Sequence, residues 1–208
     1  MIYPHINICG AIIDIIMAEI KKANLTFPKS FTKRKKTTEI ILHCAATKEG
    51  VNYSVNAIHN MHIKKGWNGI AYNYYIDLYG TIWEGRPEDC VGAHTTDHNS
   101  ISIGICYCGG VDKNNKAKDT RTPAQTAAMI WLCRYLHKKY PNATFHGHRE
   151  FANKACPSFD VKTWIKTFDL NMPDNGLTPV VKSTDNAKKV ADATTKIIDK
   201  ISKLFKKK

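Results

Sequence analysis

Short β-branched runs and longer apolar stripes at helical spacing alternate along the middle of the chain. In one of the runs, isoleucines alternate with small residues, a pattern typical of an inner strand. Tyr79-Gly80 separates two other runs and predicts a hairpin turn. The predicted strands are residues 39–43, 71–78, 81–84, 100–108 and 143–146.

The clearest helix is predicted from Pro123 to about Tyr140. Thr122 and Gln125 have the spacing of a capping box, and Pro141 ends the helix. Two shorter helices are predicted, one from Ser54 to about Lys65 and one that begins after Asp160. Because strands alternate with helices and include a hairpin, the sequence predicts an α/β fold with a mixed central β-sheet flanked by helices over residues 38–170.

Both ends of the chain are predicted to add helices to this domain. In residues 1–37 an apolar stripe is followed by a basic linker, and packing on the domain is favoured over membrane contact for the stripe. In residues 171–208 a linker precedes a basic amphipathic helix, a type of helix that binds anionic surfaces or a partner, or lies solvated. The N-terminal stripe consists of Ile12, Ile13, Ile16, Met17 and Ile20.

The formal net charge of +13 indicates an anionic partner, but the lysines and arginines crowd the two ends of the chain. The basic C-terminal helix is therefore expected to contact an anionic membrane or the cell wall. Nucleic acid is not expected as a partner, because the basic runs lack interleaved aromatic residues and a recognisable reading motif. We expect the protein to be a monomer.

The cysteines and the N-terminus indicate where the chain folds. The seven cysteines are an odd number without the spacing of a disulfide scaffold, so buried, reduced cysteines are expected at every position except Cys156. The apolar run from Ile8 to Ile20 contains Asp14 and Glu19 and lacks the features of a signal peptide. We therefore expect synthesis in the cytoplasm without a signal peptide.

His148 and Cys156 form the first candidate site. Histidine and cysteine are good zinc ligands, and a loop that leaves at His148 and returns at Cys156 allows both to reach one ion. A catalytic zinc takes three protein ligands and a water. His43 is the best candidate for the third ligand because it ends a predicted buried strand, whereas His59 and His62 lie on a predicted helix.

Ordered motifs across residues 38–170 carry a resemblance to a known family. They are Ile41–Thr47, Gly66-Trp67 with Ala71–Tyr74, Asp77–Arg86, Val91–His94, Asn99–Ile105, Thr122–Gln125 and His148–Asp160. This series resembles the zinc-dependent N-acetylmuramoyl-L-alanine amidases, which include phage lysozymes of the amidase type and the peptidoglycan recognition proteins. The two ends of the chain find no counterpart in that family.

The resemblance implies that His43, His148 and Cys156 bind one zinc ion. Tyr72 and Lys154 match the residues that phage members use around the metal, whereas many bacterial members have a glutamate near the position of Tyr72. The resemblance also implies that His94, expected at the rim of the groove, and Asn99 contact the substrate. Some members carry aspartate in place of Cys156, and recognition proteins that only bind often lack the cysteine.

The resemblance therefore implies a peptidoglycan hydrolase that cleaves the amide bond between N-acetylmuramic acid and L-alanine with a zinc-activated water. The simplest biological role is that of a phage or prophage endolysin, which reaches the wall after another protein has permeabilised the membrane. An antibacterial toxin or a recycling enzyme with the same chemistry are alternatives. A recognition module that binds peptidoglycan without cutting it is a further alternative, which the presence of Cys156 argues against.

Overall fold

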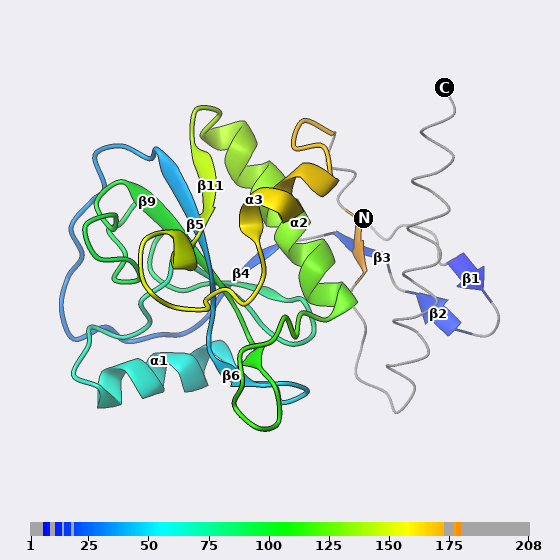
Figure 1. Ribbon diagram of the computed structural model, residues 1–208, viewed down its shortest axis with the longest axis horizontal. Coiled ribbons are helices and arrows are strands. Elements are labelled where there is room, and N and C mark those ends of the chain that lie inside the picture. The colour runs from blue at the N-terminus through cyan, green and yellow to red at the C-terminus, as the bar shows by residue number, and fades with distance from the viewer. Residues whose placement is uncertain (1–5, 9–10, 14, 18, 173–176, 180–208) are drawn as a thin grey trace.

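A mixed six-stranded sheet forms the centre of the protein. The computed structural model describes residues 6–8, 11–13, 15–17, 19–172 and 177–179 (Figure 1). The strand order across the sheet is β11 (Thr144–Gly147), β5 (Glu39–Cys44), β9 (Ser102–Tyr107), β7 (Tyr74–Ile76), β8 (Ile82–Glu84) and β4 (Ile20–Lys22). Strands β7 and β8 form the predicted antiparallel hairpin, and all other neighbours are parallel. The predicted α/β fold with a mixed sheet is confirmed.

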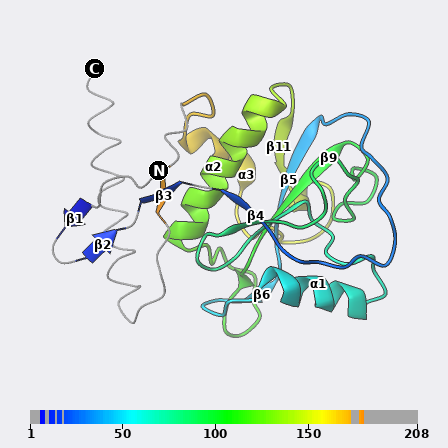
Figure 2. The ribbon, with the colours of Figure 1, turned by 180° about the vertical axis from the view of Figure 1, so that it is seen from behind.

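The central strands are buried on both faces, as parallel strands require. Ile40, Ile41 and Leu42 of β5 are fully buried. One face packs against α2 (Pro123–Lys139) and the short α3 (Val161–Trp164), and the other packs against α1 (Val55–Lys64). Figure 2 shows the same layers from behind. Because side chains alternate along a strand, Ile40 and Leu42 face α2, whereas His43 faces the side of the sheet covered by α1.

Capping residues predicted from the sequence begin all three α-helices. The Thr122 hydroxyl accepts the N–H of Gln125, and the Gln125 side chain accepts the N–H of Thr122 in return, so the capping box is formed. The Ser54 hydroxyl accepts the N–H of Ala57 at the start of α1. Asp160 caps α3, which is shorter than expected because it passes into the 3-10 helix η2 (Ile165–Thr167).

The predicted N-terminal helix is wrong, because the described residues of that segment form strands. Short runs of isoleucine fit either period, and their β-branched side chains favour extended backbone. The strands are β1 (Ile6–Ile8), β2 (Ala11–Ile13), β3 (Ile15–Met17) and β4, of which β4 joins the edge of the main sheet beside β8. The linker predicted after residue 170 contains β12 (Leu177–Pro179), which pairs with β3.

The predicted C-terminal amphipathic helix lies outside the described residues. Within the described ranges, no helix has the length and apolar character needed to cross a bilayer. Two short strands, β6 (Thr47–Lys48) and β10 (Gly110–Val111), follow β5 and β9 in the sequence and form a separate parallel pair. The loop between β11 and α3 contains the 3-10 helix η1 (His148–Glu150) and carries the candidate site.

Candidate metal centre

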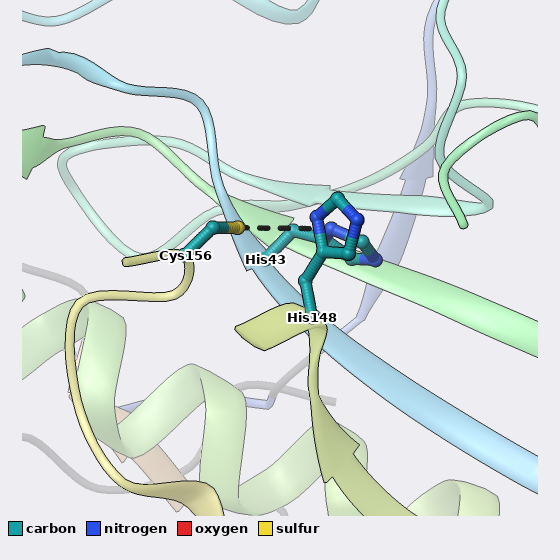
Figure 3. A group of neighbouring side chains, drawn as sticks. All are labelled: His43, His148 and Cys156. Atoms are coloured by element: carbon teal, nitrogen blue, oxygen red, sulfur yellow. Dashed lines mark hydrogen bonds between the residues drawn. The ribbon is translucent and has the colours of Figure 1, made fainter. Parts of the chain in front are cut away.

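Parallel pairing of β5 and β11 brings two histidines together at one edge of the sheet. Leu42 pairs with Gly147, so the residues that follow them, His43 and His148, come out side by side at the carboxyl ends of the two strands. Cys156 returns to the same place in the loop before α3 (Figure 3). One ligand atom from each of the three residues lies within 4.8 Å of the other two. The group is the one predicted from the sequence.

The distances suit a single zinc ion. The Cys156 Sγ lies 3.8 Å from the His43 Nδ1, and the ring centroids of His43 and His148 are 4.5 Å apart. Zinc bonds of about 2.3 Å to sulfur and about 2.1 Å to nitrogen place tetrahedral ligand atoms roughly 3.5 Å from one another. The two nitrogen donors and one sulfur donor are also the ligand types that zinc prefers. The donor set therefore fits zinc in both chemistry and spacing.

The surroundings keep both histidines in the form that binds metal. Burial lowers the pKa of His43 well below its ordinary value, and the nearby His94, His148 and Lys154 lower it further. Burial and the charge of Lys154 also lower the pKa of His148. A ligand imidazole must be unprotonated, so these effects favour metal binding at neutral pH.

The surroundings of Cys156 disfavour its thiolate form unless a cation lies beside it. Two effects raise the pKa of the Cys156 thiol above its ordinary value. The larger is the hydrogen bond with the Cys44 side chain, and the second is burial. The backbone N–H of Cys44 donates to the Cys156 Sγ at 3.3 Å, which supplies one donor to the sulfur. Two adjacent thiols in a buried place do not both ionise unaided. A divalent cation between His43, His148 and Cys156 would supply the missing positive charge.

Tyr72 and Lys154 both lie near the candidate ligands. The Tyr72 ring centroid is 5.2 Å from that of His43, and burial raises the pKa of its phenol well above the ordinary value. Tyr72 is therefore a phenol that can donate a hydrogen bond rather than a base at neutral pH. Lys154 is exposed two residues before Cys156, and its charge reaches both histidines. The catalytic roles of Tyr72 and Lys154 stay predictions.

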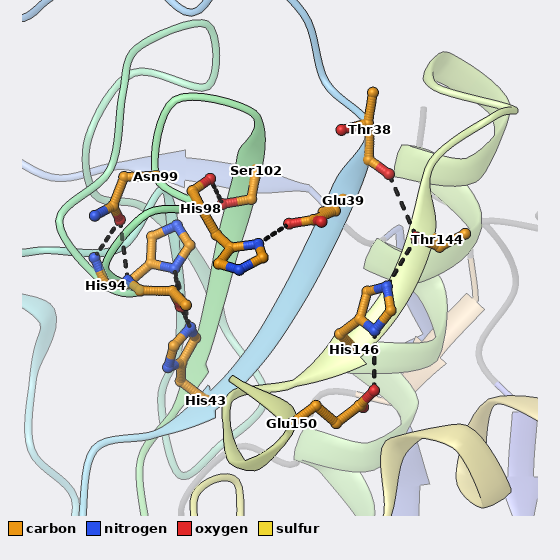
Figure 4. A network of polar contacts seen from close by, with 11 residues as sticks. Thr38, Glu39, His43, His94, His98, Asn99, Ser102, Thr144, His146 and Glu150 are labelled. Atoms are coloured by element: carbon orange, nitrogen blue, oxygen red, sulfur yellow. Dashed lines mark hydrogen bonds and ion pairs between the residues drawn. The ribbon is translucent and has the colours of Figure 1, made fainter. Parts of the chain in front are cut away.

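The two residues predicted to contact substrate have structural partners. His94 is only 7% exposed, so it lies beneath the site rather than at the rim, and its Nδ1 is 3.0 Å from the His43 Nε2 (Figure 4). The Asn99 Oδ1 accepts the backbone N–H groups of His94 at 2.7 Å and of Thr95 at 3.0 Å. Substrate contact by His94 and Asn99 stays a prediction.

Sequence reasoning missed Glu150, which ties η1 to the end of β11. One carboxylate oxygen accepts the N–H of Gly147 at 2.7 Å, and the other contacts His146 Nδ1 and Lys162 Nζ, each at 3.0 Å. His146 also contacts the Thr144 hydroxyl at 2.8 Å. Glu150 thus fixes the turn that presents His148, and its place three residues after Gly147 is the spacing of a capping box.

A family model, similar sequences and a similar solved structure all relate this chain to the same group of enzymes. Residues 33–159 match the family model described as N-acetylmuramoyl-L-alanine amidase. The endolysins of Enterobacteria phage K11 and Escherichia phage T7 are 38% and 40% identical over 146 residues, which are 70% of this chain and 97% of each relative. An endolysin N-acetylmuramoyl-L-alanine amidase from Clostridium intestinale superposes with a TM-score of 0.63 at 28% identity, covering 74% of this chain and 96% of that one.

Proposed function

The chain belongs to the N-acetylmuramoyl-L-alanine amidase family, and we propose that it acts with one zinc ion held by His43, His148 and Cys156. It is an amidase of the phage endolysin type, which hydrolyses the bond between N-acetylmuramic acid and L-alanine in peptidoglycan. The observation that carries the zinc proposal is that two imidazoles and one thiol, from strand β5 and from the loop between β11 and α3, converge on one point.

The residues around the ligands supply the rest of the chemistry. When bound, zinc lowers the pKa of a water to about 7 and polarises the carbonyl of the scissile amide. The Lys154 ammonium stabilises the negative charge that develops on the carbonyl oxygen. The Tyr72 phenol, which stays protonated, donates its O–H and orients the attacking water or the oxyanion. The water oxygen forms a bond to the lactyl carbonyl carbon of N-acetylmuramic acid, the C–N bond to L-alanine breaks, and the proton of the water goes to the released amino group.

Product analysis tests this proposal. Purified peptidoglycan is digested by the protein as prepared, after treatment with a zinc chelator, and after zinc is restored, and the released fragments are identified by mass. We expect free stem peptides that begin at L-alanine, lost on chelation and recovered with zinc. Peptidoglycan that is bound but uncut in the presence of zinc would instead make the chain a recognition module, and the roles of Tyr72 and Lys154 would be withdrawn.

We also propose that the C-terminal segment brings the enzyme to anionic surfaces of the cell, where it acts once another protein has permeabilised the membrane. Its basic residues include Lys196, Lys200, Lys203, Lys206, Lys207 and Lys208. Changing these six lysines to glutamine is expected to reduce binding to anionic vesicles and to cell walls while cleavage of soluble fragments continues. The matched change to arginine keeps the charge and should keep binding. Equal binding by both variants would contradict the proposal.

A further inference from the structure

We propose that His94 is a positioning residue that holds His43 in the tautomer able to bind the metal, an inference that rests on the proposed zinc site. The Nδ1 of His43 faces Cys156, whereas its Nε2 lies 3.0 Å from the Nδ1 of His94. If Nδ1 of His43 donates its lone pair to zinc, the ring proton must be on Nε2. That N–H then donates to the unprotonated Nδ1 of His94. Partners of this kind fix the orientation and basicity of ligand histidines in metal sites.

The contacts of the His94 ring fit an acceptor at Nδ1. The ring is only 7% exposed, and its Nδ1 faces the His43 Nε2 at 3.0 Å. A neutral imidazole carries one N–H and one acceptor nitrogen, so an acceptor at Nδ1 puts the proton of His94 on Nε2. The Thr95 hydroxyl lies 3.1 Å from the Nδ1 of His94 and 3.4 Å from the Nε2 of His43. His43 thus meets two polar groups on the side away from Cys156.

The absence of side chains at two glycines leaves the space that the His94 ring occupies. A Cβ built on Gly104 in β9 would lie 2.5 Å from the His94 ring, and its three nearest atoms would all belong to that ring. A Cβ on Gly92 would lie 2.4 Å from the same ring. Asn99 holds the backbone of His94 and Thr95 from the other side through its Oδ1. Two glycines and an asparagine, all outside the ligand set, therefore determine where the imidazole lies; Figure 4 shows the asparagine beside His94.

A purely structural histidine is a poor explanation of this arrangement. The Nε2 of His94 is buried without a hydrogen-bond partner among the described residues. An unsatisfied buried donor is destabilising, and an apolar side chain at this position would avoid that cost. The polar contacts of the ring are with Thr95 next to it and with His43. The hydrogen bond with His43 therefore explains why this position carries an imidazole.

The experiment compares two replacements that differ in one acceptor. In His94→Asn the amide oxygen lies near the place of Nδ1 and still accepts from His43, whereas His94→Leu fills the space without an acceptor. Zinc affinity is measured by competition with a chromophoric chelator, and the absorption spectrum of the cobalt-substituted protein reports the ligand geometry. We expect His94→Leu to bind zinc about 10- to 100-fold more weakly with an altered cobalt spectrum, and His94→Asn to stay close to the parent.

Further variants separate positioning from other effects. Gly104→Ala leaves His94 in the chain but displaces its ring, so it should weaken zinc binding in the same direction, and it serves as the test if His94→Leu fails to fold. His98 is a half-buried histidine of the same loop, and it pairs with Glu39. The control variant His98→Asn should leave zinc affinity unchanged. A rise in KM alone, with parental zinc affinity in His94→Leu, would overturn the positioning role and make His94 a substrate residue.

The outcomes also distinguish this inference from the proposed function. A parent chain that binds no zinc would overturn the zinc site and the role of His94 with it. A parent that binds zinc in equal amount to protein, together with a folded His94→Leu variant of the same affinity and cobalt spectrum, would overturn only the role of His94. Weaker zinc binding in both His94→Leu and Gly104→Ala, with His94→Asn near the parent, would support the inference.

Discussion

Changing Cys156 to serine is expected to abolish hydrolysis and to remove most of the bound zinc. A serine hydroxyl in this place stays protonated, so the site loses its one anionic ligand and keeps only two neutral imidazoles. Loss of a direct ligand should exceed the roughly 10- to 100-fold loss of metal affinity that outer partners produce. The measurements are the zinc content of the purified protein and the release of stem peptides from peptidoglycan.

Cys90→Ser is the matched control for this change. Cys90 is also buried, and its thiol donates to a carboxylate oxygen of Asp89 at 3.4 Å, a bond that a serine hydroxyl can also make. Zinc content and activity should therefore be unchanged in Cys90→Ser. A Cys156→Ser protein with full activity and a confirmed metal content would show that the sulfur is not a ligand.

The sequence predicted the elements whose local signals agree with the final fold. The run at 39–43 is apolar and β-branched, and the Thr122 to Gln125 capping box is formed in the structure. The prediction of an N-terminal helix was wrong because adjacent apolar residues such as Ile12 and Ile13 fit both the helical and the strand period when their tertiary neighbours are not known. Pairing of β4 with β8 and of β3 with β12 is a long-range contact, which decides between the two periods only after the chain has folded.

The candidate site likewise has features that local sequence patterns predict and features that only the folded structure sets. Residue type and order indicated the three candidate ligands, because the motifs around His43 and His148 are local in the sequence. That these two histidines would emerge from adjacent parallel strands depends on the pairing of Leu42 with Gly147, which local patterns do not encode. The burial of His94 depends on Gly92 and Gly104, which give space only once three segments have packed together.

Changing Lys154 to methionine is expected to lower kcat about 10²- to 10³-fold while the zinc content stays at the parental level at neutral pH. Methionine keeps much of the length and apolar stem of lysine but removes the charge, and loss of one group that stabilises an oxyanion typically has this effect. The measurements are kcat on a soluble muropeptide and zinc content. Lys166→Met, an exposed lysine on the short helix η2, is the control and should leave both unchanged.

The same variant should change the pH dependence of zinc binding in a predictable direction. The Lys154 charge lowers the pKa values of His43 and His148, so removing it lets both rise toward the ordinary value. Protons then compete with zinc at a higher pH, and Lys154→Met should release zinc earlier than the parent as the pH falls. Lys154→Arg keeps the charge and should follow the parent. Unchanged kcat in Lys154→Met would remove the lysine from the mechanism, whereas reduced kcat with the predicted pH shift places its charge beside both the ligands and the reacting carbonyl.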